Sequence, residues 1–158
     1  MTAQALATAL LAKGWQLAVA ESCTGGLIAA ACTDLAGSSA WFERGFVTYS
    51  NAAKTDLLGV PESLLSQHGA VSEPVAVAMA QGALRRSRAH IAVSVTGIAG
   101  PSGATAGKPV GMVCFGFASA KGVSTATMHF NGDRAAVRTQ AVGYALAQLH
   151  SVLNQTSF

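Results

Sequence analysis

The sequence is poor in charged and aromatic residues. Charged side chains make up 11% of the 158 residues and aromatic side chains 6%, whereas 51% of the residues are hydrophobic. A typical soluble domain has about a quarter charged residues, so we expect extensive burial in a core and in a subunit interface. The length predicts a single domain, residues 1–158, that needs no disulfide or metal ion to fold, and the composition predicts a homo-oligomer.

Long hydrophobic runs are also absent. Each apolar stretch is interrupted by Gly, Ser, Thr or a charged residue well before the ~20 residues that a membrane-spanning helix needs. The first residues, Met1-Thr2-Ala3-Gln4, lack the basic region of a signal peptide. These absences argue against a membrane protein and predict a cytoplasmic location.

Cysteine is scarce, and basic charge is only slightly in excess. Cys23, Cys32 and Cys114 are odd in number and match no metal-ligand spacing, so we predict neither a disulfide nor a zinc site. The net charge is +3, and its one local cluster, residues 85–88, falls where a helix is expected to end. No aromatic residue lies beside that cluster for base stacking, so nucleic acid is not an expected partner.

Hydrophobic periodicity and turn residues predict alternating helices and strands. Helices are expected at about 3–13, 25–35, 51–58, 61–68 and 73–88 and from a cap at 131–133 to about 153, and strands at about 15–20, 41–49, 90–96, 109–118 and 123–130. The last two strands form an antiparallel hairpin. The order α-β-α-β-α-α-β-β-β-α indicates an α/β fold, a three-layer α/β/α sandwich with a mixed β-sheet.

A strand-to-helix turn is predicted at Ala20-Glu21-Ser22-Cys23-Thr24-Gly25-Gly26, where an apolar run stops and a helix of small residues begins. Backbone N–H groups at a helix start favour negative charge, and the turn places the Ser22 hydroxyl and the Cys23 thiol beside them. The two glycines let a ligand or another backbone approach closely. The same residues suit an ordinary helix cap, so the turn alone leaves both interpretations open.

A second glycine-rich loop, residues 97–103, also follows an expected strand. Both loops then belong at the carboxyl edge of the sheet, and one pocket built from both is the simplest arrangement. Neither loop has the G-x-G-x-x-G pattern, and the segment 103–109 is one residue short of a P-loop and continues into a strand. An ATPase and a dinucleotide-binding dehydrogenase are therefore disfavoured.

A nucleophilic Ser22 needs a base, and the four histidines are scattered along the chain. Lys54 is the better candidate, because a lysine amine can activate a serine in a Ser-Lys dyad. Its pKa would have to fall from about 10.4 to about 7–8, which corresponds to about 3–5 kcal/mol of destabilisation of the charged form. The apolar neighbours Val47, Leu57 and Leu58 would allow such burial, although spacing alone favours an exposed Lys54.

Five ordered segments carry a resemblance to a known family: Ala20-Glu21-Ser22-Cys23-Thr24-Gly25-Gly26, Val47-Thr48-Tyr49-Ser50-Asn51-Ala52-Ala53-Lys54, His68-Gly69-Ala70-Val71-Ser72, Val95-Thr96-Gly97-Ile98-Ala99-Gly100-Pro101 and Lys108-Pro109-Val110-Gly111. Together they resemble the CinA C-terminal-domain family over about residues 3–153, in its stand-alone form. Five ordered motifs are far more specific than any one of them. They favour functional roles for Ser22 and Lys54 over the structural interpretations.

The resemblance implies an amidohydrolase that converts nicotinamide mononucleotide to nicotinic acid mononucleotide and ammonia, with no metal ion or cofactor. It implies Ser22 as the nucleophile, Lys54 as the base and Tyr49 as a hydrogen-bonding group within that dyad. Backbone N–H groups of Cys23, Thr24, Gly25 and Gly26 are the expected oxyanion donors, each worth about 3–4 kcal/mol.

Other substrate contacts implied by the resemblance come from the second loop and from basic residues. The wall opposite the nucleophile is expected to contain Thr96, Gly97 and Gly100. The candidates for binding the 5′-phosphate, for which arginine offers bidentate contact, are Lys108, Arg134 and Arg138. The chain departs from the family pattern at Arg44, His90 and Ser102, and Arg44 is expected at the pocket rim or in a subunit contact.

Alternatives to this mechanism stay open at the level of the sequence. Cys23 is a second candidate nucleophile, because a thiol at a helix N-terminus is readily ionised. A protein with the same pocket could also be catalytically silent and bind a pyridine nucleotide as a sensor or regulatory partner. A DNA-binding role through residues 85–88 predicts an affinity that falls with salt.

Overall fold

Five strands form one mixed sheet in the computed structural model, which describes residues 3–155. The strands are β1 (Leu17–Glu21), β2 (Phe42–Val47), β3 (Ile91–Gly97), β4 (Met112–Ser119) and β5 (Gly122–His129). Their order in the sheet is β2-β1-β3-β4-β5, with β1 parallel to β2 and β3 and antiparallel pairing from β3 to β5. The two central parallel strands therefore end at the same edge of the sheet.

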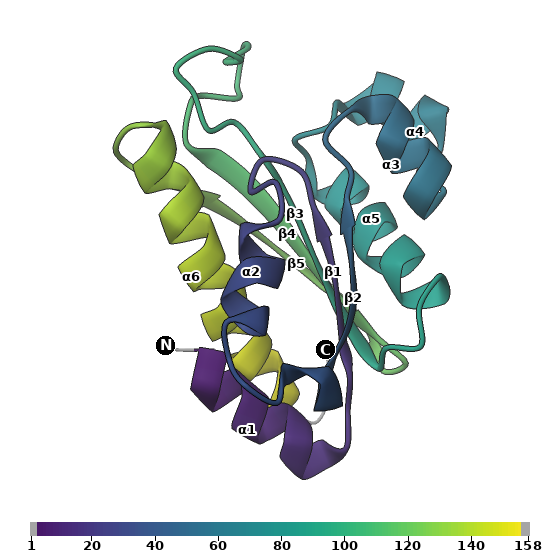
Figure 1. Cartoon of the computed structure of the whole chain (residues 1–158). Helices are drawn as coiled ribbons and strands as arrows, with labels where there is room; N and C mark the ends of the chain where they lie inside the picture. Colours follow the sequence, from purple (N-terminus) through teal and green to yellow (C-terminus); the bar gives the residue numbers. More distant parts are fainter. Residues whose placement is uncertain (1–2, 156–158) are drawn as a thin grey trace.

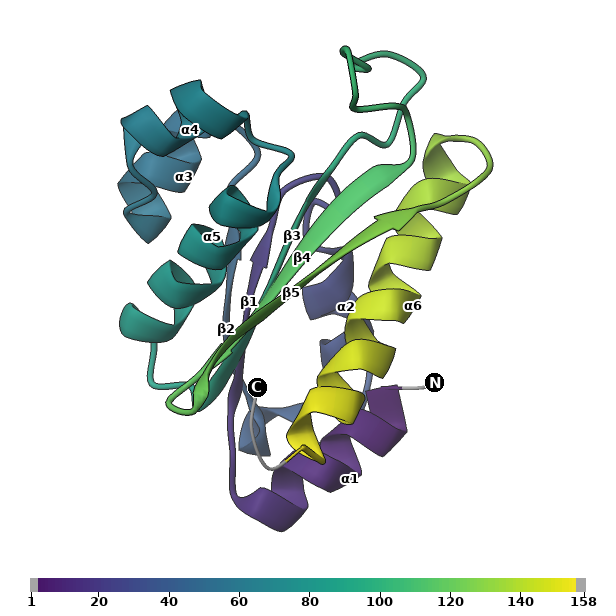
Figure 2. The same ribbon diagram turned by 180° about the vertical axis from the view of Figure 1, so that it is seen from behind.

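Helices cover both faces of this sheet (Figures 1 and 2). One layer contains α1 (Ala3–Lys13), α2 (Leu27–Thr33) and α6 (Arg134–Leu153), and the other contains α3 (Asn51–Leu58), α4 (Glu62–His68) and α5 (Glu73–Arg85). In the second layer α5 lies on the sheet, while α3 and α4 pack against α5. The predicted three-layer sandwich with a mixed sheet is confirmed, and α3, α4 and α5 lie close to the ranges 51–58, 61–68 and 73–88 expected between β2 and β3.

The two sides of the sheet carry side chains of different size. Val19 and Phe115 point into the larger core, under α1, α2 and α6. Ala18 and Ala20 face the smaller core, under α3, α4 and α5. Successive residues of a strand point to opposite faces, so β1 supplies large side chains to one layer and small ones to the other.

Several element boundaries differ from the predictions by a few residues. The clearest case is α2, which begins at Leu27 instead of about residue 25 and ends at Thr33 instead of about residue 35. Gly25 and Gly26 have φ angles of 57° and 108°, a left-handed backbone that cannot belong to a right-handed helix. The residues between Glu21 and Leu27 therefore form a turn that is not part of α2.

Some large apolar side chains remain at the surface, including Leu11, Val47, Leu57 and Val110. No helix among residues 3–155 has both the length and the apolar character needed to cross a membrane. The homo-oligomer expected from composition stays a prediction.

A close contact between α3 and α5 supplies the first test. A Cβ atom added to Gly82 of α5 would lie 2.1 Å from the carbonyl oxygen of Leu58 at the end of α3. We expect Gly82→Ala to lower the free energy of unfolding by about 1–3 kcal/mol, measured by urea denaturation. The matched control is Gly143→Ala in α6, where an added Cβ meets nothing within 4 Å and the free energy should rise by up to about 1 kcal/mol. Equal effects of the two changes would contradict this packing.

Candidate active site

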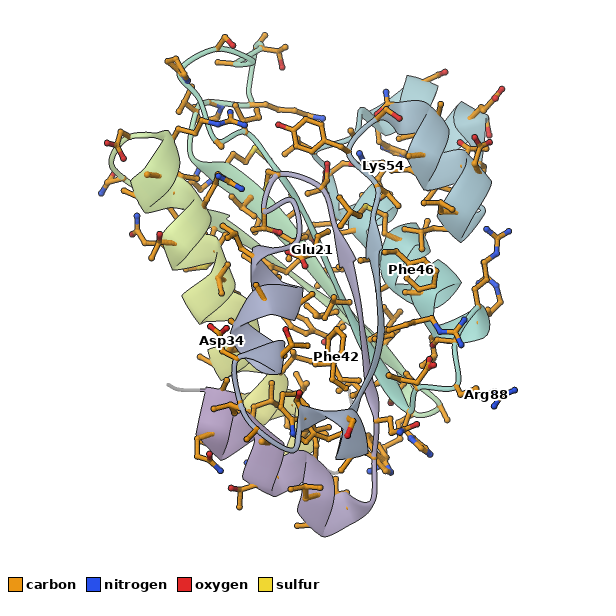
Figure 3. All side chains as sticks on the ribbon, viewed as in Figure 1. Glu21, Asp34, Phe42, Phe46, Lys54 and Arg88 are labelled. Carbon is orange, nitrogen blue, oxygen red and sulfur yellow. The ribbon has the colours of Figure 1, made fainter. Side chains whose placement is uncertain are left out.

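The Ser22 turn lies at the carboxyl edge of the sheet, directly after β1. The amide of Ser22 donates to the carbonyl of Val95 on β3, at 3.0 Å, and so extends the pairing of β1 with β3 by one residue. Because side chains alternate along a strand, Glu21 points toward α2 and Ser22 toward the layer of α3. Figure 3 shows Glu21 beside α2 and Lys54 on the α3 side.

Helix α3 delivers Lys54 to Ser22. The Ser50 hydroxyl accepts a hydrogen bond from the amide of Ala53 and caps the helix, as expected for a serine at this position. One turn later the Lys54 side chain, only 1% exposed, extends to the Ser22 turn. Its Nζ lies 3.0 Å from Ser22 Oγ and donates to the carbonyls of Thr48 at 3.1 Å and Tyr49 at 3.4 Å.

The surroundings of Lys54 favour its neutral form. Burial lowers the pKa of the amine below its usual value, because the charged form loses its hydration. Among residues 3–155 the only salt bridge joins Glu43 and Arg44, so no carboxylate pairs with the Lys54 amine. A neutral Nζ has a lone pair that can accept the proton of the Ser22 hydroxyl.

Cys23 lines the same cleft as Ser22 and Lys54, but its thiol is poorly suited to nucleophilic attack. Burial raises its pKa to about 11, and the thiolate is the nucleophilic form. The expectation of a readily ionised thiol rested on a helix start at this position, whereas α2 begins four residues later. Burial also raises the pKa of Cys32 to about 12, and all three cysteines are free thiols.

Tyr49 contacts the Ser22 and Lys54 pair through its backbone carbonyl, not through its hydroxyl. Its carbonyl accepts a hydrogen bond from Lys54, while its hydroxyl accepts one from Arg134 Nη2 at 2.9 Å. Arg134 also donates from Nη1 to the carbonyl of Gly100, at 2.9 Å. The first residue of α6 therefore bridges the segment after β2 and the second glycine-rich loop.

Arg138, one turn further along α6, binds the turn formed by residues 22–26, which we call the nucleophile turn. Its Nε donates to the carbonyl of Cys23 at 3.1 Å and its Nη2 to that of Thr24 at 3.2 Å. The phosphate contact expected of Arg138 from the sequence stays a prediction. Lys108 is also engaged, because its amine donates to the carbonyl of His68 at the end of α4.

Two adjoining hollows lie along this edge of the sheet. A catalytic cleft of about 290 Å³ contains Ser22, Lys54 and the loop glycines Gly97 and Gly100. A second hollow, of about 750 Å³, lies between the Pro101–Val110 loop and the start of α6. Arg134 and Ala99 line both, so the Arg134 guanidinium stands at the boundary between them.

The structure brings together only some of the expected binding residues. Thr24 and Thr96 are buried, and their hydroxyls bond to Glu21 and to the carbonyl of Ala70. The residues expected at the site that line neither hollow are Thr24, Gly25, Gly26, Thr96 and Lys108. Asn51 and Val71, which the sequence did not single out, do line the catalytic cleft.

Glu21 is a residue of this site that the sequence analysis passed over. Its side chain is 0% exposed, and its carboxylate accepts hydrogen bonds from the Thr24 hydroxyl at 2.6 Å and from the amides of Ile28 at 2.9 Å and Ala29 at 3.0 Å. Because Glu21 accepts from these first amides of α2, they are not free to bind another anion. The signal in the sequence was a carboxylate at the last position of an apolar strand.

The three departures from the family pattern lie in different places. Ser102 lines the catalytic cleft. His90 is remote from it, where its ring stacks on Trp15 and its Nδ1 accepts a hydrogen bond from the Gln16 amide. Arg44 lines neither hollow, and its guanidinium binds Glu43 and the carbonyl of Arg86. The other place expected for Arg44, a subunit contact, stays a prediction.

No group of three or more His, Cys, Asp or Glu side chains that could hold a metal ion occurs within residues 3–155. The polar groups that converge on the cleft are instead the Ser22 hydroxyl, the Lys54 amine and the Arg134 guanidinium. This set offers a nucleophile, a base and a cation.

Comparison with known proteins gives matches over nearly the whole chain. Residues 1–153 match the family model described as CinA C-terminal domain. A protein named nicotinamide-nucleotide amidohydrolase PncC from Enterobacter agglomerans is 63% identical over 142 residues, which cover 89% of this chain and 87% of that protein. The protein of the same name from Escherichia coli (strain K12) is 61% identical over 142 residues, with 89% and 86% covered.

A solved structure has the same fold. The crystal structure of the competence/damage inducible protein CihA from Agrobacterium tumefaciens superposes with a TM-score of 0.93 at 49% sequence identity. The match covers 97% of this chain and 93% of that one.

The buried amine predicts a specific dependence of stability on pH. Because burial lowers the pKa of Lys54 in the folded protein, the unfolded chain binds more protons between that lowered pKa and the usual value near 10.5. Stability therefore increases with pH across this window. We expect the free energy of unfolding of the wild type, minus that of Lys54→Met, to rise with pH there, as measured by urea denaturation at a series of pH values.

Leu10, a fully buried residue of α1, provides the control for this measurement. The corresponding difference for Leu10→Ala should stay nearly flat across the same window, because the substitution changes a buried side chain but no titratable group. A flat difference for Lys54→Met would mean that the Lys54 amine is not desolvated.

Proposed function

We propose that this chain, which belongs to the CinA C-terminal domain family, is an amidohydrolase that converts nicotinamide mononucleotide to nicotinic acid mononucleotide and ammonia. Two relatives at 63% and 61% identity carry the name nicotinamide-nucleotide amidohydrolase, which supports the substrate. The mechanism rests on one observation. The buried Lys54 amine lies 3.0 Å from Ser22 Oγ and has no carboxylate partner among residues 3–155.

Acylation begins when the neutral Lys54 amine takes the proton of the Ser22 hydroxyl and Oγ attacks the carboxamide carbon. The resulting ammonium is stabilised where it stands, since the carbonyls of Thr48 and Tyr49 accept two of its protons. Lys54 then returns a proton to the leaving nitrogen as the C–N bond breaks. Ammonia departs and the acyl group remains on Ser22.

The oxyanion of this step needs N–H donors that are not already engaged. The amides of Ser22, Gly25, Leu27, Ile28 and Ala29 all donate to protein oxygens. No acceptor for the Thr24 and Gly26 amides is found within residues 3–155, where the Cys23 amide has only its own thiol as a partner. The Cys23 and Thr24 amides directly follow Ser22 in the chain, so they are the donors we assign to the oxyanion in place of the Gly25 amide.

Deacylation repeats the proton transfers with water. Lys54, neutral again after ammonia has left, takes a proton from a water molecule that attacks the ester carbon. The proton then passes to Ser22 Oγ as the C–O bond breaks, which releases the carboxylic acid product and restores the dyad. The acid loses its proton to solvent and becomes the nicotinate carboxylate. The same amine thus serves as base and acid in both halves of the reaction.

Arg134 is the residue we assign to the 5′-phosphate. Of the three basic candidates, Lys108 lines neither hollow and Arg138 lines only the second hollow. Arg134 faces both the catalytic cleft and the second hollow. A ring held beside Ser22 would place its ribose phosphate toward this guanidinium.

Removal of either member of the dyad should abolish turnover. We expect Ser22→Ala and Lys54→Ala each to reduce ammonia release from nicotinamide mononucleotide by about 10³-fold or more, measured with a glutamate dehydrogenase coupled assay. Lys121→Ala, which removes an exposed lysine on the hairpin between β4 and β5, should keep wild-type activity.

Three outcomes would contradict this mechanism in different ways. Full activity of Ser22→Ala would remove the serine nucleophile, and loss of that activity on mild thiol alkylation would replace it with Cys23. Binding of the nucleotide by calorimetry, without ammonia release by the wild type, would instead show a catalytically silent binding protein.

The assignment of Arg134 predicts a change in substrate preference. We expect Arg134→Ala to raise KM for nicotinamide mononucleotide by about 10- to 100-fold, the effect of losing a charge-assisted hydrogen bond, with little change for nicotinamide riboside, which has no phosphate. Tyr49→Phe removes the bond between Arg134 and the tyrosine hydroxyl but keeps the guanidinium, so it should preserve the ratio of the two KM values. Equal effects of Arg134→Ala on both substrates would refute the assignment.

A further inference from the structure

The most deeply buried charged group near Ser22 is on the residue before it, on the opposite face of β1. The Glu21 side chain is 0% exposed and forms no salt bridge, the pair Glu43–Arg44 being the only one within residues 3–155. A buried carboxylate without a cationic partner is costly unless hydrogen bonds satisfy it. Glu21 receives three such bonds, all from residues 24–29.

Two of these bonds tie Glu21 to the start of α2. This helix follows Gly26, which provides no side-chain cap, so its first amides would otherwise lack partners. Glu21 Oε1 takes the amide of Ile28 and Oε2 that of Ala29. A carboxylate is also the favourable charge at this end of a helix. Glu21 thus acts as the missing cap from a position outside the helix.

The third bond reaches into the nucleophile turn itself. Thr24 Oγ1 donates to Glu21 Oε1 at 2.6 Å, across a turn that is closed by the hydrogen bond from the Gly25 amide to the Ser22 carbonyl. One carboxylate therefore links the last residue of β1, the middle of the turn and the first turn of α2. The spatial relation between Ser22 and the amides that follow it depends on this link.

Arg138 also restrains the nucleophile turn, through the carbonyl groups of that turn. The Arg138 guanidinium binds the carbonyls of Cys23 and Thr24. In a planar trans peptide the C=O and N–H point in opposite directions, so fixing the Cys23 carbonyl on Arg138 directs the Thr24 amide away from that side chain. Glu21 fixes the Thr24 side chain on the same residue. The orientation of the Thr24 amide is thus set by two contacts.

We propose that Glu21 is a positioning residue for catalysis: its carboxylate, through Thr24 and the first amides of α2, holds the amides of Cys23 and Thr24 in the orientation that receives the oxyanion. This inference rests on the proposed serine mechanism. Glu21 touches neither the substrate nor the reacting atoms. Its effect belongs to the transition state, because only there does the carboxamide oxygen become an anion.

The test uses Glu21→Gln, which preserves the size and shape of the side chain. Whichever way the amide is placed, its NH₂ group faces a backbone N–H that had donated to the carboxylate, so one donor at the start of α2 loses its acceptor. We expect kcat for nicotinamide mononucleotide to fall by about 10- to 100-fold, somewhat less than the loss of an oxyanion donor. KM should change little, since the interaction is absent from the ground state.

A core substitution separates positioning from general destabilisation. Leu149→Ala removes a fully buried side chain of α6 that belongs to the larger core and lines neither hollow. It should lower the melting temperature at least as much as Glu21→Gln does, while kcat at 15 °C stays at the wild-type value. If Leu149→Ala reduced kcat as strongly as Glu21→Gln, the positioning role would be overturned.

A second measurement does not depend on turnover of the nucleotide. Phenylmethylsulfonyl fluoride is attacked by the serine Oγ, which forms an O–S bond and releases fluoride, and a sulfonyl oxygen then occupies the place of the oxyanion. We expect the rate of labelling at Ser22, followed by intact mass spectrometry, to fall by a similar factor in Glu21→Gln. Ser22→Ala should remain unlabelled at this position.

The outcomes distinguish the two proposals. The role of Glu21 alone would be overturned by the following combination. The wild type releases ammonia, Ser22→Ala abolishes that activity, and Glu21→Gln keeps the wild-type kcat and the wild-type rate of labelling. A wild type that is labelled at Ser22 but releases no ammonia would overturn the proposed substrate, and slower labelling in Glu21→Gln would still support its role. A Ser22 that reacts with neither reagent would overturn both.

Discussion

Burial of the Lys54 amine without a counter-charge is the constraint on which the rest of the site depends. A buried amine whose hydrogen-bond partners are one hydroxyl and two carbonyls is less stabilised as an ammonium than it would be in water, so its pKa is lowered. The fold maintains this condition through the capped helix α3, which lies against α5 at Gly82. The packing of α3 on α5 outside the cleft thus positions the helix that carries Lys54.

The alternation of side chains along β1 keeps the Glu21 carboxylate away from the Lys54 amine. Glu21 and Ser22 are consecutive, so their side chains leave the strand on opposite faces, and the carboxylate goes to α2 while the hydroxyl meets Lys54. A carboxylate on the Lys54 side would form an ion pair and raise the pKa of the amine. A shift of one residue in this turn would therefore exchange a base for an inert ammonium ion.

Local patterns in the sequence predicted the sheet and its helices, because strands and caps are encoded in consecutive residues. The pairing of Ser22 with Lys54 was favoured only by the resemblance to the CinA C-terminal-domain family, since spacing alone favoured an exposed Lys54. Local patterns did not predict the roles of Arg138 and Glu21. The bond from Arg138 to Cys23 joins residues 115 positions apart, and only the packing of α6 on α2 brings them together. Gly25 and Gly26 were placed in a helix because residue type alone did not reveal their left-handed backbone.

The way α2 is capped also determines where an oxyanion can be bound. From the sequence, the oxyanion donors were expected at residues 23–26, because the helix was expected to begin there. Instead, α2 begins at Leu27, and the amides of Ile28 and Ala29 in its first turn are already bound by Glu21. On the proposed mechanism the developing charge must go to the turn before the helix, beside Ser22 and close to the ammonium formed on Lys54. Glu21 therefore excludes the anion from one set of amides while it organises the neighbouring set, so a single buried carboxylate accounts for both the location and the geometry of the oxyanion site.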